Sequence, residues 1–173
     1  MRVIFIGWAW LAVTVSVSAT TSRFDVNAPG SPTQSGWVSA VSGNGSDGSV
    51  SLATAAVGGV SVDTRNRGTI NGGGAESSMW NDFVFANGSD SVGEGLQITL
   101  SGLQADSEYP ITVWAFDDST SGNATGFWNG NQLTFPDSPD PTSLANYAVT
   151  FNVTTNASGV AVIQGLVGNP HSS

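Results

Sequence analysis

The chain has 173 residues, no cysteine, one histidine and a formal charge of −9. Its acidic balance excludes nucleic-acid binding, which needs clustered positive charge to displace counterions. The absence of cysteine excludes thiol catalysis and cysteine-based zinc sites, and a single histidine, His171 near the C-terminus, excludes a multi-histidine metal site and argues against a Ser-His-Asp hydrolase.

The N-terminal segment has the pattern of a signal peptide. Met1-Arg2 gives a positive start, an apolar run covers Val3–Val17, and Val17-Ser18-Ala19 provides small residues at a cleavage point. As a helix the run would span roughly 22 Å, short of a ~30 Å hydrocarbon core. We therefore expect residues 1–19 to be removed on export and to stand outside the fold. An uncleaved N-terminal anchor is the alternative.

The remaining residues, 20–173, predict one secreted or cell-surface domain without membrane insertion. They carry three Arg, no Lys and 13 Asp and Glu, a net charge of −10. Apolar residues alternate with polar ones in short segments that are separated by turn residues, which is typical of an all-β chain. We expect about nine strands, at Arg23–Asn27, Gly36–Val41, Ser49–Ala53, Gly59–Asp63, Gly95–Ser101, Tyr109–Phe116, Gln132–Phe135, Tyr147–Thr154 and Val160–Gln164.

One segment departs from this alternation. In Ser77–Ala86 the apolar residues Met79, Trp80, Phe83 and Val84 have a spacing that suits a short helix facing a core, although a strand over Phe83–Ala86 fits nearly as well. The pairs Asn44-Gly45 and Asn129-Gly130 predict turns. The pattern of strands predicts a single antiparallel β-sandwich or jelly roll.

The strongest functional signal follows the predicted strand at Tyr109–Phe116. The strand ends in two adjacent carboxylates, Asp117 and Asp118, and a polar loop leads to Trp128 and Asn131. Aromatic rings pack against the C–H faces of sugars, and Asp and Asn side chains bond to sugar hydroxyls. Loops on a rigid scaffold are where binding residues concentrate. These residues therefore predict a carbohydrate site in which Trp128 is an exposed stacking platform.

Two arginines and an aspartate that lies between aromatic residues give a second indication of a functional site. Arg65 and Arg67 lie two apart, so on a strand both would point the same way and could anchor polar groups of a ligand. Asp82 lies among aromatic residues, where an unpaired buried charge is costly. We expect a structural ion pair between Asp82 and Arg65 or Arg67, with direct ligand contact by the arginines as the alternative.

The other tryptophans and the acidic pair have less specific interpretations. Trp37 and Trp80 are assigned to the core, and Trp114 to packing between layers. Asp117 and Asp118 are weak candidates for a structural calcium, since hard cations take oxygen ligands. The same two acids could instead form the carboxylate pair of a glycoside hydrolase.

Several ordered pieces of the sequence resemble galactose-binding-like β-sandwich modules of secreted bacterial proteins, the jelly-roll group that includes many carbohydrate-binding modules. The matching pieces are Arg23–Asn27, Arg65–Arg67, Trp80–Phe83, Gly95–Leu103, Tyr109–Asp117 and Ala157–Ile163. The resemblance implies glycan binding by loops at one end of the sandwich, often with a structural calcium, within a larger multidomain protein. Such modules usually add one more strand after Gly159–Gly165, which Val167–Ser173 does not resemble. We therefore expect a truncated reading frame or fragment.

The sequence as a whole predicts a non-catalytic carbohydrate-binding module of an exported protein. Its ligand would be a polysaccharide or other glycan, and its site would combine Arg65, Arg67, Asp117, Asp118, Trp128 and Asn131. A structural or adhesive cell-surface module without a small ligand is the first alternative, and it requires Trp128 to be packed inside. A glycoside hydrolase is the second.

Overall fold

The computed structural model describes residues 11–17, 20–66, 79–88, 91–115, 123–136 and 144–168. Nearly all regular structure in these ranges is β-strand, apart from the 3₁₀ helix η2 (Leu144–Tyr147) and a short 3₁₀ segment at residues 79 and 80. The strands are β1 (Leu11–Val17), β2 (Thr20–Val26), β3 (Val38–Ser39), β4 (Asn44–Asp47), β5 (Val50–Val57), β6 (Ser61–Asn66), β7 (Asp82–Asn87), β8 (Gly95–Ser101), β9 (Glu108–Trp114), β10 (Asn123–Trp128), β11 (Asn131–Pro136), β12 (Ala148–Thr154) and β13 (Ala161–Leu166).

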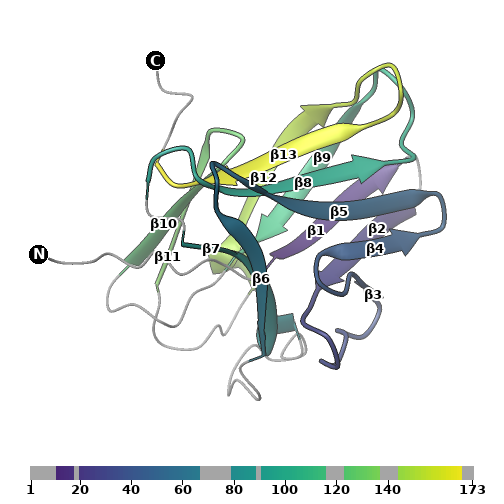
Figure 1. Ribbon diagram of the computed structural model, residues 1–173. Coiled ribbons are helices and arrows are strands. Elements are labelled where there is room, and N and C mark those ends of the chain that lie inside the picture. The colour runs from purple at the N-terminus through teal and green to yellow at the C-terminus, as the bar shows by residue number, and fades with distance from the viewer. Residues whose placement is uncertain are drawn as a thin grey trace, which may run out of the picture.

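Two large sheets form a β-sandwich, as predicted. One has the strand order β12-β9-β1-β2-β3 and the other β11-β10-β13-β8-β5-β4, while β6 and β7 form a separate two-stranded ribbon. Figure 1 shows β5, β8 and β13 crossing in front of β1 and β9, with the ribbon toward the lower end of the view. The strand pairs are antiparallel except for the short pair of β2 and β3, which is parallel.

Alternating sequence explains how each sheet buries one face. In β8, Leu96, Ile98 and Leu100 are almost completely buried, whereas Gln97 and Thr99 between them are half-buried. Because successive strand residues point to opposite faces, the apolar set enters the space between the sheets. Each such aliphatic side chain contributes roughly 1.5–3 kcal/mol when fully removed from water. The core lies between the sheets.

The segment for which we expected a short helix is mostly strand. Met79 and Trp80 form a short helical turn, and β7 then runs through Phe83. Its first five residues are all buried, a pattern of strands that are covered on both faces. A continuous apolar run can therefore imitate helical spacing in the sequence. No helix in the described part of the chain is long and apolar enough to cross a membrane.

Residues that we expected outside the fold form β1. This strand lies between β2 and β9 and pairs with both, and its Val13 and Val15 are fully buried in the core. The same apolar, β-branched residues that make a leader hydrophobic also suit a buried strand. The expectation that residues 11–17 lie outside the fold is therefore wrong for the folded chain, whereas removal of residues 1–19 on export stays a prediction.

Candidate functional site

A loop that joins β2 to β3 is held by two buried carboxylates. The Asp25 carboxylate accepts a hydrogen bond from the backbone N–H of Gln34 at 2.6 Å, and the Asp82 carboxylate accepts one from the backbone N–H of Ala28 at 2.5 Å. Both acids are 1% exposed. Buried backbone N–H groups need acceptors, so these carboxylates fix the two halves of the loop.

Asn27, at the start of the loop, adds a third buried polar anchor. Its side-chain amide donates to the Thr33 hydroxyl at 3.2 Å, and its carbonyl oxygen accepts from the Ser39 hydroxyl at 2.9 Å. Asn27 is fully buried, and it follows directly after β2, two residues beyond Asp25. The loop of residues 28–37 thus has a defined shape although its sequence is rich in Gly, Ser and Pro.

The burial of these acids changes their ionisation. Burial raises the pKa of Asp25 to about 6, opposed by the hydrogen bond from Gln34 and reinforced by the charge of Asp82. Burial likewise raises the pKa of Asp82 to about 6, opposed by hydrogen bonds from the Ser31 hydroxyl and the Ala28 backbone. The Oδ1 atom of Asp82 is buried and accepts no hydrogen bond within the described ranges, which fits this direction.

Two tryptophans meet where this loop returns to the sheet. The rings of Trp37 and Trp114 pack edge to face with their centroids 5.4 Å apart and their planes at 72°. Both side chains are half-buried. Assigning Trp37 to the core and Trp114 to the space between layers therefore overstated their burial. The alternation of β9 indicates this partial exposure in the sequence itself. Trp114 shares a face of the strand with Thr112 and not with the buried Ile111 and Val113.

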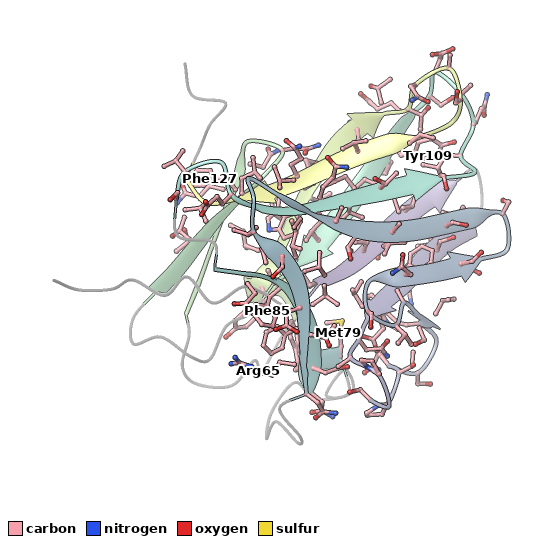
Figure 2. All side chains as sticks on the ribbon, in the orientation of Figure 1. Arg65, Met79, Phe85, Tyr109 and Phe127 are labelled. Atoms are coloured by element: carbon pink, nitrogen blue, oxygen red, sulfur yellow. The ribbon has the colours of Figure 1, made fainter. Side chains whose placement is uncertain are left out.

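Arg65 lies on the ribbon with its guanidinium group over two phenylalanine rings. Its Cζ atom is 5.9 Å from the ring centroid of Phe83 and 5.5 Å from that of Phe85, while the side chain remains exposed. A cation over aromatic faces is held electrostatically and keeps its donors available to a ligand. Figure 2 shows Arg65 beside Phe85.

The expected ion pair between Arg65 and Asp82 is not formed. Arg65 lies opposite Phe83 in the ribbon and Asn66 lies opposite Asp82, so Arg65 and Asp82 project from opposite faces. The amide of Asn66 donates instead to the Ser31 hydroxyl at 2.7 Å, which joins the end of β6 to the loop. Arg67 falls outside the described residues, so its pairing with Asp82 stays a prediction.

Trp128, expected as an exposed platform, is buried. It is 2% exposed and belongs to the core cluster. Its ring covers Gly165 on the adjacent strand β13, where an added Cβ would lie 2.6 Å from ring atoms of Trp128. The prediction that this ring presents a stacking face is therefore wrong. The glycine that accommodates the ring lies 37 residues away in sequence, so the residues flanking Trp128 carried no sign of it.

Asn131 stands at the hairpin turn that follows Trp128. The turn residues Asn129 and Gly130 both have positive φ, as the predicted Asn-Gly turn requires. The exposed Asn131 donates from its amide to the carbonyl oxygens of Trp128 and Asn129, each at 3.2 Å. Figure 2 shows Phe127, the neighbour of Trp128, well separated from Arg65. The structure thus does not bring Asn131 and Trp128 together with Arg65 in one site.

Two further predicted site residues, Asp117 and Asp118, fall outside the described residues. The structure therefore does not test whether they bind calcium. Within the ranges that the structure does describe, no three His, Cys, Asp or Glu side chains gather in a way that could hold a metal ion. The proposed calcium site therefore stays a prediction.

Comparison with known proteins returns no family model, no curated protein and no solved structure that matches this chain. The function is therefore argued from the geometry of the chain itself.

Proposed function

We propose that the chain is a non-catalytic carbohydrate-binding module whose glycan lies on Trp37 and Trp114 and extends toward Arg65 of the β6–β7 ribbon. The observation that carries this proposal is the half-exposed pair of Trp37 and Trp114. Partly exposed tryptophan rings offer apolar faces to the C–H bonds of a sugar, and their indole N–H groups add a polar contact. A partly exposed pair of aromatic rings therefore suits a sugar.

The rigidity of the neighbouring loop supports this proposal. Asp25, Asn27 and Asp82 hold the loop through hydrogen bonds before any ligand arrives. A site that is already ordered loses less conformational entropy when it binds, so more of the contact energy appears as affinity. Sugars make few apolar contacts each, and their binding therefore benefits strongly from such order.

Polar partners for the sugar hydroxyls are available on two sides. Arg65 keeps an exposed guanidinium group on the ribbon, and Asn66 is exposed at the end of the same strand. Asp117 and Asp118 follow Trp114 closely in sequence, and we propose them with Arg67 as further hydroxyl partners. A structural calcium held by the two acids remains part of this proposal.

The acids with raised pKa fit a supporting role better than a catalytic one. A glycosidase acid must reach the glycosidic oxygen, but Asp25 and Asp82 are 1% exposed and accept hydrogen bonds from loop amides. We accordingly propose binding without hydrolysis. We also propose that the module is exported and belongs to a larger secreted or cell-surface protein, as its leader pattern and its resemblance to secreted modules indicate.

A structural or adhesive surface module is the second candidate, and the burial of Trp128 favours it. This alternative requires that ring to be packed inside, which is its position in the structure. The two candidates differ at the other tryptophan pair. An adhesive module needs no sugar platform, so Trp37 and Trp114 would then contribute only to packing.

Titration of tryptophan fluorescence with a panel of plant and algal polysaccharides, in calcium and then in EDTA, tests the proposal. We expect saturable binding of one glycan, weakened at least about tenfold by Trp37→Ala or by Trp114→Ala. Phe127→Ala, which removes a half-buried ring on β10, is the matched control and should leave binding unchanged. Unchanged affinity in a folded Trp37→Ala variant, or no response to any glycan, would favour the adhesive module.

A further inference from the structure

The N-terminal strand β1 occupies the centre of one sheet. It pairs antiparallel with β2 from Leu11↔Val26 to Val17↔Thr20 and antiparallel with β9 from Ala12↔Trp114 to Val15↔Ile111. Val13 and Val15 point into the core and are fully buried. No other strand lies between β2 and β9 in this sheet as the structure describes it, so β1 alone joins its two halves.

The same residues carry the leader pattern, and the expected cleavage point falls at the link between β1 and β2. Val17 and Thr20 are paired, so only residues 18 and 19 connect the two strands. Cleavage after Ala19 would therefore detach β1 from the chain and leave every residue of β2 in place.

Loss of β1 would open two strand edges that face each other. The backbone groups of β2 and β9 that now bond to β1 would lose their partners, and the inward side chains beside it would lose their cover. These side chains, Phe24, Val26, Ile111 and Val113, are at most 1% exposed in the folded chain. Unpaired edges bordering an apolar groove bind additional strands readily.

We propose that the space between β2 and β9 is a strand-acceptor site, which binds one extended segment of a partner protein after residues 1–19 are removed. A second copy of this chain is not the donor, because a processed copy has also lost its residues 11–17. The proposal rests on removal of the leader and is independent of the proposed glycan site.

The chemistry of the partner segment can be read from β1. It must run antiparallel to both neighbours, and it must place small or β-branched apolar residues where Val13 and Val15 now lie. Its other face tolerates polar residues, because Thr14 lies between the exposed Arg23 and the half-buried Thr112. A donor with acidic groups on this outer face would gain from Arg23, whereas an acidic group on the inner face would be buried without a partner.

A strand-exchange experiment on the full chain tests the site. A protease recognition sequence is inserted between Val17 and Thr20, the folded protein is cut, and a fluorescent peptide of residues 11–17 is added in excess. Uptake is measured by fluorescence polarisation, both under native conditions and after unfolding and refolding in the presence of the peptide. We expect one peptide per chain and a higher melting temperature for the complex.

Peptide variants separate the two faces of the strand. A peptide with Val13→Asp should bind at least about 100-fold more weakly, because a charge would enter the core. The matched Thr14→Asp peptide carries its charge on the outer face beside Arg23 and should bind within about tenfold of the original. Equal uptake of the two kinds of variant would overturn the proposal.

Two other results would also overturn it. One is the absence of peptide uptake both under native conditions and on refolding. The other is an exported chain whose measured mass shows that it retains residues 11–17, because the acceptor site would then be filled by its own strand. A mass that starts at Thr20, together with stabilisation by the peptide, would support the proposal.

Discussion

Two regions of this molecule that contain tryptophan differ in how deeply their rings are buried. Trp128 follows a polar loop in sequence, yet its ring closes over Gly165 of the adjacent strand and is 2% exposed. Trp37 and Trp114 contact one another beside a loop that buried carboxylates hold, and both remain half-buried. The comparison teaches that the residue on the neighbouring strand, and not the flanking loop, decides whether an aromatic ring can face a ligand.

The largest effect of a single substitution is expected from Trp128→Ala. Removing this ring empties a packed part of the core and should lower the free energy of unfolding by about 3–5 kcal/mol. Urea denaturation measures the loss. Trp37→Ala is the matched comparison, and because its ring is half-buried it should cost less than half as much. Equal losses for the two variants would remove the distinction between the regions.

Gly165→Ala tests the same contact between Trp128 and Gly165 by changing the glycine instead of the ring. The added Cβ would lie 2.6 Å from ring atoms of Trp128, and such overpacking typically costs about 1–3 kcal/mol. In a Trp128→Leu background the cost should shrink, since the ring that it strikes is gone. A double-mutant cycle by chemical denaturation gives the coupling directly. A coupling near zero would show that the ring and the glycine do not determine each other.

The loop that holds the other tryptophans should respond to pH. The pKa of Asp25 and of Asp82 is raised from 3.8 to about 6 in the folded state. Between these values the folded chain binds more protons than the unfolded chain, so stability is greatest below about pH 4 and is lost as the pH rises through 6. We expect each of the two carboxyls to contribute roughly 2–3 kcal/mol less stability at pH 7.5 than at pH 4, which is about 5 kcal/mol for the pair.

Thermal melts of matched variants attribute this pH dependence to the buried acids. Asp82→Asn should flatten the fall in melting temperature between pH 4 and pH 7.5. Asp63→Asn removes the same charge from an exposed position on β6 and should leave the fall intact. A slope that is unaltered by Asp82→Asn would mean that this carboxyl ionises normally in the folded protein.

The smallest effect is expected from Asn131→Ala. This exposed side chain donates only to the carbonyl oxygens of its own turn, so its loss should cost about 0.5 kcal/mol. Retention on any glycan that binds the module should not change, because the turn is far from Arg65. Affinity electrophoresis compares the two proteins. A loss of retention would show that Asn131 belongs to the ligand site, as the sequence predicted.

Much of the β-architecture could be predicted because it depends on local alternation. Each of the nine predicted strands overlaps an observed strand, and β8 has the predicted bounds. The additional strand β1 also alternates, but its residues were assigned to the leader. The other additional strands, β4, β7 and β10, lack that signal. In β10, glycine and polar residues interrupt the pattern, and β4 begins at Asn44, where Asn44-Gly45 resembles a turn. The continuous apolar run of β7 does not alternate between apolar and polar residues.

The candidate site was less predictable because it depends on distant pairings. Asp82 was recognised as an acid that needs a partner, but the partner that the described residues show is the Ala28 backbone, 54 residues away, and not Arg65. A backbone N–H has no signature in the sequence. Exposure of Trp37 likewise depends on the return of its loop to β9, which only the folded chain defines.

The position of β1 also has a consequence for the timing of folding. Ala12 pairs with Trp114, so the sheet cannot close around β1 until about a hundred further residues have been synthesised. At roughly 5–20 residues per second this takes about 5–20 s. During that interval the apolar segment can form only its local hairpin with β2, and it remains accessible to the export machinery that would compete for it. The topology thus sets a kinetic window in which the proposed export could begin before β1 is buried.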